Sequence, residues 1–467
     1  MNTREVPTLT RLAARSLVKH EALDTHVLQE LPVELFPPLF MEAYENKHSR
    51  SLKILLQNWP FSRLPLGALM KTAQVKPILD SLLGLDELNL GNNYPKRLKL
   101  RVLDLGTRPQ NFWDVWSGHT DDAYLPEARD VRAVIAHNRK SGAKHPFQVW
   151  DDVCLQAQKE FSENASIFRW VRRKAYLGKV GCPRLHVTTF PVFLLKQILN
   201  DSDLNTVLEL KVHCTENEPT VDTIFAAVGQ MRNLQELLFY RISDPGVLLG
   251  RENVALELCK KMKKLTFLRK IYLSNVFFLK DNLGKICRSL NASLETLSIS
   301  DCELTESDWK DLDLHLKTSK LKTLCLCSVN LSSFSFITLQ ALLKRVSGTL
   351  TTFKLEECKI TDSHINDLLP TLSHCQQLTT ISFYGNTFST TILKDILLKT
   401  ASMRQLNLEL YPAPQESYYT GGAFNMNTIA QLFPQLRQHL RAIRQPKEAL
   451  LYTKQCIHCG KELIYHL

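Results

Sequence analysis

Two cysteines near the C-terminus have a spacing that can bind a metal. Cys456 and Cys459 lie three residues apart, and two thiolates at that spacing can hold one zinc ion. A closed tetrahedral site needs two further ligands, and His458 and His466 are the nearby candidates. Because that ligand set is unusual, a capping turn without metal is the favoured interpretation. We therefore predict no cofactor, with zinc at Cys456 and Cys459 as the alternative.

The sequence offers no convincing catalytic arrangement. It contains no nucleophile elbow, no Walker loop and no metalloprotease helix, and its 14 histidines are dispersed. We therefore predict that the protein is not an enzyme and that its chemistry is binding.

The composition indicates a globular protein with a leucine repeat. Leucine occurs 79 times in 467 residues and glycine 17 times, and 44% of the residues are hydrophobic. Lys and Arg (58) exceed Asp and Glu (47), but the basic residues are scattered and form no long aromatic-interleaved arm, so no direct nucleic-acid binding is expected. No apolar run reaches 18 residues and no signal peptide is apparent. These features predict no membrane contact and an intracellular location, in the cytoplasm and with access to the nucleus.

A Leu-x-x-Leu-x-Leu pattern recurs from about residue 200 and predicts the fold. Its starts are 25 to 34 residues apart, the period of leucine-rich repeats with one strand and one helix in each unit. The fold class expected is therefore α/β: a curved leucine-rich-repeat solenoid with an N-terminal helical docking region. The copies, after an opening one at Val207-Leu210-Val212, are Leu234-Leu237-Phe239, Leu268-Ile271-Leu273, Leu294-Leu297-Ile299, Leu321-Leu324-Leu326, Leu350-Phe353-Leu355, Leu378-Ile381-Phe383 and Met403-Leu406-Leu408.

Polar residues mark the turns and helix starts between these strands. Cys302, Cys358 and Asn386 follow the strands and are expected to hydrogen-bond the turn backbone from inside. Thr305 and Thr361 each precede an apolar stripe of helical period, which predicts a capped helix after each turn.

The concave strand face of such a solenoid is a binding surface by geometry. Its outward positions combine aromatic side chains with charges of both signs, a mixture suited to a protein partner. The candidate substrate-binding residues are Tyr240, Arg269, Tyr272, Asp301, Glu356 and Tyr384.

The N-terminal segment has the spacing of a docking helix. After Thr8, the residues Leu9, Ala13 and Leu17 recur every fourth position, which puts them on one face of a helix with a small residue in the middle. An amphipathic helix that packs on its own domain gives the same spacing. The pattern also resembles the elongin-binding box of cullin-RING ligase receptors. About fourteen residues later, Leu31, Pro32 and Leu35 resemble the cullin-2 box, in which a Leu-Pro turn starts a helix that contacts the cullin.

The chain as a whole resembles the PRAME family of leucine-rich-repeat proteins. The resemblance runs from roughly residue 8 to residue 460. The segments that carry it include 31–40, Asn58-Trp59-Pro60-Phe61, Val102-Leu103-Asp104-Leu105, Phe112-Trp113-Asp114-Val115-Trp116, Leu294-Glu295-Thr296-Leu297, Ser382-Phe383-Tyr384-Gly385-Asn386 and Tyr411-Pro412-Ala413-Pro414.

The resemblance implies a function. Members of this family are similar to substrate receptors of cullin-2 RING ubiquitin ligases. By that resemblance elongins B and C would bind Thr8, Leu9, Ala13 and Leu17. Cullin-2, together with its RING subunit, would bind through Leu31, Pro32 and Leu35. An unidentified protein substrate would lie on the solenoid. Ala13 replaces the commoner cysteine and is a smaller contact.

A second function class stays open. The family also resembles repressors of nuclear-receptor signalling, with effects on transcription, proliferation, differentiation and apoptosis. The alternative is therefore a nuclear-receptor corepressor or scaffold that acts without the ligase. The Leu-x-x-Leu-Leu motif of such coregulators begins at Leu52, Leu79, Leu234 and Leu339, although the last two lie at repeat positions assigned to the core.

These patterns together predict five parts of the chain. They are a helical elongin- and cullin-docking region (1–78), the first leucine-rich repeats (79–117), an insertion or linker (118–146), the main solenoid (147–425) and a C-terminal cap (426–467).

Overall fold

The computed structural model divides into two compact units, which are described separately. The first comprises Met1–Cys154, Gln158–Arg184 and Gln197–Asp203, and the second Leu155–Ala157, Leu185–Lys196 and Leu204–Leu467. The structure describes residues 9–19, 23–66, 69, 100, 102–106, 148–155, 179–188, 190–214, 219–242, 251–316, 320–420, 422–455 and 461–467.

The first unit begins with a small group of helices. The elements are α1 (Leu9–Lys19), α2 (Thr25–Glu30), the 3-10 turn η1 (Val33–Leu35), α3 (Phe36–Glu45) and α4 (Ser49–Gln57). Their shared core is aromatic: the fully buried Trp59 meets Phe36, Phe40 and Phe61 edge-on at centroid distances of 6.2, 5.5 and 5.5 Å. The helical pattern read from the first sixty residues is therefore confirmed for the described part.

A short parallel sheet follows in the same unit. Its strands are β1 (Arg63–Pro65), β2 (Val102–Asp104), β3 (Gln148–Trp150), β5 (Val180–Gly181) and β7 (Ser202–Asp203), hydrogen-bonded in that order. The leucines of the upstream repeat copy, Leu100, Leu103 and Leu105, are buried on and beside β2. Strand β1 lies within the range 1–78, which was predicted to be helical. The copy at Leu85-Leu88-Leu90 and the insertion 118–146 lie outside the described residues.

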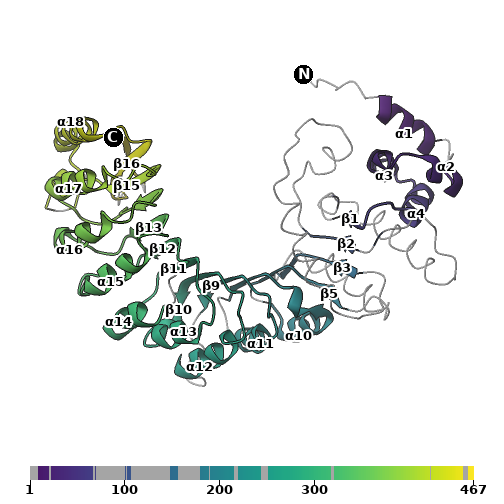
Figure 1. Cartoon of the computed structure of the whole chain (residues 1–467), viewed down its shortest axis with the longest axis horizontal. Coiled ribbons are helices and arrows are strands. Elements are labelled where there is room, and N and C mark those ends of the chain that lie inside the picture. The colour runs from purple at the N-terminus through teal and green to yellow at the C-terminus, as the bar shows by residue number, and fades with distance from the viewer. Residues whose placement is uncertain are drawn as a thin grey trace. The chain divides into compact units, whose positions relative to one another are not determined.

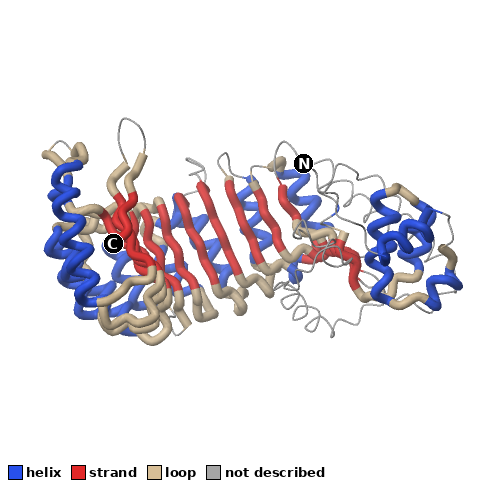
Figure 2. Tube along the Cα trace, turned by 90° about the horizontal axis from the view of Figure 1, so that it is seen from above, coloured by secondary structure: helices blue, strands red, loops and turns tan. Residues whose placement is uncertain are grey.

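The second unit is the leucine-rich-repeat solenoid, and the predicted fold class is confirmed. Its strands line the inner side of a curve and its helices the outer side (Figure 1). The strands lie side by side as the rungs of a twelve-stranded sheet in the order β17-β16-β15-β14-β13-β12-β11-β10-β9-β8-β6-β4 (Figure 2). Those strands are β4 (Val153–Leu155), β6 (Arg184–Val187), β8 (Glu209–His213), β9 (Glu236–Ile242), β10 (Lys270–Val276), β11 (Thr296–Ser300), β12 (Thr323–Cys327), β13 (Thr352–Glu356), β14 (Thr380–Ser382), β15 (Leu408–Pro412), β16 (Glu448–Tyr452) and β17 (Ile464–His466).

Helices and short 3-10 turns connect successive strands. Strands β8 to β16 pair in parallel, and β17 pairs antiparallel with β16. The parallel sheet thus continues past residue 425, where a cap was predicted to begin. The connecting elements are α10 (Val192–Asp201), η5 (Leu204–Thr206), α11 (Pro219–Val228), α12 (Arg251–Met262), η6 (Phe277–Leu279), α13 (Leu283–Ser289), α14 (Glu306–His315), α15 (Ile337–Val346), α16 (Asp362–Leu372), α17 (Thr390–Thr400), η7 (Gln415–Ser417) and α18 (Met426–Ile443).

The repeat positions assigned from the sequence form the core, with one correction. Register pairs Leu324 with Phe353 and Phe353 with Ile381, and all three are completely buried. The last copy was placed at Met403-Leu406-Leu408, but Ile381 pairs with Glu409, so the copy is Leu406-Glu409-Tyr411. A charged residue at a core position hid this register from the hydrophobic pattern.

Glu409 can occupy that core position because its charge is compensated. It is completely buried, and its Oε2 accepts hydrogen bonds from Arg444 Nη2 at 2.5 Å and from the Tyr411 hydroxyl at 2.7 Å. A buried carboxylate without such partners would be expelled or protonated. Arg444 follows α18, so this ion pair connects the end of that helix to the sheet.

The predicted turn-bonding residues do bond the turn backbone. Asn386 is 1% exposed, accepts the N–H groups of Cys358 and Ile360, and donates to Leu355 O at 2.7 Å. Cys302 and Cys358 donate their thiols to backbone carbonyls in the same slot. The turns after β11, β13 and β14 are therefore fixed from inside.

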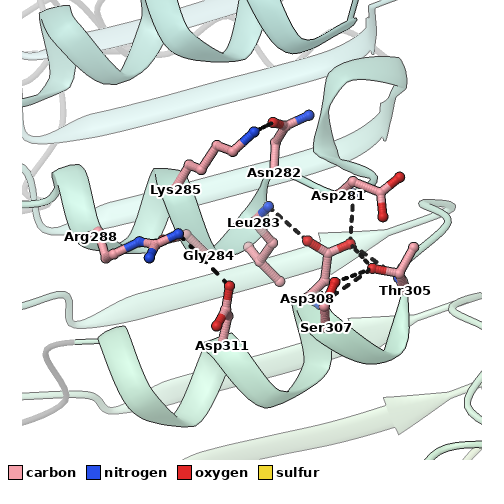
Figure 3. Close-up of polar contacts among 10 residues, drawn as sticks. All are labelled: Asp281, Asn282, Leu283, Gly284, Lys285, Arg288, Thr305, Ser307, Asp308 and Asp311. Atoms are coloured by element: carbon pink, nitrogen blue, oxygen red, sulfur yellow. Dashed lines mark hydrogen bonds and ion pairs between the residues drawn. The ribbon is translucent and has the colours of Figure 1, made fainter.

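Neighbouring helices are connected by shared caps. Thr305 and Asp308 form a capping box at the start of α14, and Asp308 also reaches the preceding helix (Figure 3). Its carboxylate accepts the backbone N–H groups of Leu283 at 3.0 Å and Asp281 at 2.8 Å, which satisfies donors at the start of α13. Thr361 forms the second predicted capping box, with His364. One buried carboxylate thus sets the spacing of two adjacent repeats.

No helix in the part of the chain that the structure describes is long and apolar enough to cross a membrane.

Candidate functional site

Helix α1 has one buried face and one exposed face. Ala14 and Val18 are buried at 4% and 1% exposure. Away from these residues Leu9 is 86% exposed and Ala13 is exposed, while Leu17, three residues after Ala14, is half-buried at the edge between the two faces. The predicted docking face of Leu9, Ala13 and Leu17 is therefore not the face that packs on the domain. Thr8 lies outside the described residues.

Two arginines fix this orientation of α1 against α3. Arg15 Nε lies 2.6 Å from Oε1 of Glu42, and Arg11 Nε lies 3.7 Å from Oε2 of the same carboxylate. Glu42 is 3% exposed, and its hydrogen bond raises the pKa of the Arg15 guanidinium. Both arginines lie on the side of α1 that carries Ala14 and Val18. The hydrophobic docking face is consequently held toward the outside.

The predicted cullin-binding residues lie at the turn before α3. Pro32 is exposed and precedes η1, while Leu31 and Leu35 are half-buried. The sequence comparison with the cullin-2 box expected the following helix to make the contact. Yet every residue of α3 from Phe36 to Tyr44 is buried. Only the turn itself, residues 31–35, offers a surface to a partner here.

The leucines of the described Leu-x-x-Leu-Leu motifs are buried. In the motif that starts at Leu52 all three leucines are completely buried, and those of the motifs at Leu234 and Leu339 are at most 9% exposed. Docking through this motif requires the leucines on an exposed helix face. The motif at Leu79 lies outside the described residues.

Part of the predicted concave surface lines one open hollow. This hollow has a volume of about 630 Å³ and includes Tyr240 and Asp301 among the predicted residues. The Lys211 ammonium lies 5.3 Å from the centroid of the Tyr240 ring, within the range of a cation–π contact. Burial raises the pKa of Tyr240, so its hydroxyl is a neutral donor at physiological pH. The remaining lining residues are His213, Arg241, Ser274 and Asn275.

The sequence analysis missed several residues of this hollow. Arg241 and Asn275 occupy the same strand-end position as Asp301, two residues after the second inward residue of their repeats. Lys211 occupies the position of Tyr272, between the two inward residues of its strand. These repeat positions were the available signal, but the prediction gave more weight to aromatic anchors.

The other predicted concave residues lie elsewhere on the sheet. Arg269 precedes β10 and lies 3.7 Å from Glu295, and Tyr272 is half-buried one row further along β10, where burial raises its pKa. Glu356 is paired with Lys354 at 3.4 Å. The Tyr384 hydroxyl hydrogen-bonds Glu462 at 2.5 Å, and burial together with this carboxylate raises the pKa of Tyr384.

The metal candidates are not placed by the structure. Cys456 and Cys459 lie outside the described residues. Among the residues that are described, no three histidine, cysteine or acidic side chains are grouped so as to hold a metal ion.

Comparisons with known proteins decide the family. A family model described as the PRAME N-terminal domain matches residues 6–113, and the PRAME C-terminal domain matches residues 147–467. The chain belongs to the PRAME family. It is similar to PRAME family member 20 of Homo sapiens, with 37% identity over all of this chain and 98% of the relative. PRAME family members 8 and 7 of Homo sapiens are each 36% identical over the same shares.

Two solved structures were also found. A protein of Bacteroides fragilis has 13% identity and a TM-score of 0.31, and covers 54% of this chain and 82% of its own. An internalin of Listeria monocytogenes has 14% identity and a TM-score of 0.29, and covers 56% and 80%.

Proposed function

We propose that this PRAME family protein is a non-enzymatic substrate adaptor of a cullin-2 RING ubiquitin ligase. In this proposal the docking face of α1 binds elongin C of the elongin B–C pair, and the turn 31–35 binds cullin-2. The solenoid then holds the protein to be ubiquitinated in the cytoplasm or nucleus. The observation that carries the proposal is the 86% exposure of Leu9 on a helix whose opposite face is fixed.

The anchoring of α1 supports a role in docking. An isolated helix of 11 residues is marginally stable in water, so its formation usually adds a cost to binding. Here Ala14, Val18 and the Arg15–Glu42 ion pair already hold the helix on the domain. A partner therefore meets a preformed face. Burying Leu9 in a partner groove would contribute about 1.5–3 kcal/mol.

The burial of α3 limits the proposed cullin contact to the turn that precedes this helix. Because Phe36 to Tyr44 are all buried, a cullin can reach Leu31, Pro32 and Leu35 without unfolding the domain, but not the helix that follows. The proposal therefore assigns the turn, with Pro32 at its outermost point, to cullin-2.

The corepressor alternative has less support in this chain. In the three copies of its motif that lie in the described part of the chain, the leucines are buried in the repeats and in α4. Nuclear-receptor binding would then need another surface, such as the concave face.

A pull-down from cell lysate tests the proposal. The full chain is expected to recover elongin C and cullin-2, and the Leu9→Asp, Leu17→Asp double variant is expected to lose both. Leu398→Asp is a matched control, because Leu398 is 52% exposed on the outer helix α17. Recovery of elongin C by the double variant would disprove the assignment of α1. A Pro32→Asp variant that keeps elongin C and loses cullin-2 would separate the two contacts.

A further inference from the structure

One residue at or just beyond the end of each of six successive strands, β9 to β14, has a left-handed backbone. These rim residues are Arg241 (φ 47°), Asn275 (φ 50°), Asp301 (φ 51°), Ser328 (φ 52°), Glu357 (φ 53°) and Gly385 (φ 73°). Each lies two positions after the second inward residue of its repeat, so they form one row along the edge of the concave face.

The left-handed backbone of the rim residues costs conformational energy for every residue that has a side chain. A side chain in the left-handed region costs roughly 1–2 kcal/mol relative to glycine, and asparagine and aspartate cost the least. Glycine occupies this position at 385, where an added Cβ would lie 2.4 Å from Glu357 Cγ. Arg241 and Glu357, by contrast, carry long charged side chains that the turn does not need. Strained residues of this kind are often retained for binding.

The charges of the row are separated along the sheet. At the β8–β9 end the exposed Lys211 and Arg241 line the hollow, and neither has an ion-pair partner among the described residues. At the other end the rim carries Asp301 and Glu357, with the Ser328 hydroxyl 3.1 Å from Glu357 Oε2. The polar side chains of Ser274 and Asn275 lie between these ends.

We propose that this rim binds an extended peptide segment of a partner protein that carries an acidic residue and, three to six residues away, a basic one. The acidic side chain meets Lys211 and Arg241, and the basic side chain meets Asp301 when it is three residues away or Glu357 when it is six residues away. Calling that partner a ligase substrate rests on the proposed function, but the binding itself does not.

Strand spacing sets the distance between the two charges. Neighbouring strands lie about 4.8 Å apart, so Arg241 and Asp301 are about 10 Å apart across two intervals, and Arg241 and Glu357 about 19 Å across four. An extended peptide that crosses the strands advances about 3.3 Å per residue. These lengths give a separation of three to six residues. The hollow of about 630 Å³ is within the size range of a ligand site.

The mixed charge favours a peptide over a nucleic acid. The rim and the neighbouring Lys211 together carry two cations and two carboxylates, which give no net positive stripe, and Asp301 and Glu357 would repel a phosphate backbone. A peptide with both signs satisfies both ends.

Peptide selection on the full-length chain tests this inference. A display library of random 12-residue peptides is expected to yield sequences with Asp or Glu three to six positions from Lys or Arg. A selected synthetic peptide is then measured by fluorescence anisotropy. The Lys211→Glu, Arg241→Glu variant is expected to bind it at least about tenfold more weakly, because two attractions become repulsions. Exchanging the acidic residue of the peptide for lysine is expected to restore binding to that variant.

Controls make the result decisive. Glutamate is compatible with the turn, since Glu357 occupies the equivalent position with the same backbone. Lys264→Glu with Lys399→Glu makes the same change in net charge at exposed positions outside the rim and is expected to bind like the wild type. Leu9→Asp is also expected to bind the peptide normally, which separates this inference from the elongin proposal. Selected peptides without the charge pair, or equal binding by the rim variant, would overturn it.

Discussion

Arg15 Nε lies 2.6 Å from Oε1 of the buried Glu42, and this ion pair decides which face of α1 is presented to a partner. The pair joins an exposed residue of α1 to the interior of the helical group through α3. Leu9 and Ala13 lie on the exposed side of the helix, with Leu17 at its half-buried edge. The docking face is therefore a consequence of a contact that sequence spacing alone does not reveal.

Removing Glu42 should loosen α1. Glu42→Ala takes away the acceptor of Arg15 and Arg11, and we expect the free energy of unfolding to fall by about 1–2 kcal/mol. Amide hydrogen exchange of residues 9–19 should become faster. Glu45→Ala is the control, because Glu45 is 44% exposed and pairs only with Arg11 in the contacts described here. Unchanged exchange in Glu42→Ala would contradict the anchoring role.

Replacing Gly284 by alanine should destabilise the solenoid. A Cβ at this position would lie 1.9 Å from Asp311 Oδ2 and 2.6 Å from Asp311 Cβ, so α13 and α14 would have to move apart. We expect Gly284→Ala to lower the free energy of unfolding by about 1–3 kcal/mol in a denaturant titration. Gly348→Ala meets no atom within 4 Å and should change it by about 0.5 kcal/mol or less. Equal stabilities of the two variants would show that the helices are not packed this closely.

Asp308 should matter more than other acidic residues of α14. Its carboxylate caps two helices, so Asp308→Ala leaves the N–H groups of Asp281, Leu283 and Thr305 without their acceptor. The expected loss in free energy of unfolding is about 2–3 kcal/mol, and Asp308→Asn should lose less because it keeps one oxygen. Glu306→Ala removes only an exposed pair with Lys310 and should cost about 0.5 kcal/mol or less. A similar loss in both alanine variants would exclude the double-cap role.

The buried thiols should resist alkylation until the pH is high. Burial raises the pKa of Cys287 and Cys358 to about 12 and that of Cys375 to about 11. Because a raised pKa keeps these groups as thiols, iodoacetamide at pH 8 should leave them unmodified in the native chain. In guanidinium chloride their pKa values return toward about 8.5 and all three should react. Mass spectrometry of the labelled peptides is the readout. Native Cys287 that reacts as fast as unfolded Cys287 would contradict its burial.

The sequence predicts the solenoid well because its signal is local. Leucines at fixed spacing form the core of each repeat, and Asn386 and Thr305 act at their turns and helix starts as expected. The last repeat was misplaced by three residues because its core carries Glu409. The ion pair that stabilises Glu409 comes from Arg444, 35 residues later, and no local pattern contains that information.

The candidate site was predicted less completely. The spacing of Leu9, Ala13 and Leu17 indicated a face, but its exposure depends on the contact between α1 and α3. The sequence of α3 did not predict that the helix is buried, because its prolines and aromatic residues are also compatible with an exposed helix. Lys211 and Arg241 line the same hollow only because β8 and β9, which are distant in sequence, pair in parallel.

Binding of the purified full-length chain to the elongin B–C heterodimer is the most direct test of the central claim. Isothermal titration should give one-to-one binding for the wild type. Leu9→Asp should bind about tenfold to a hundredfold more weakly, because a buried leucine contributes about 1.5–3 kcal/mol. Leu398→Asp should bind like the wild type. No binding by the wild type, or undiminished binding by Leu9→Asp, would contradict the assignment of α1 as the docking helix.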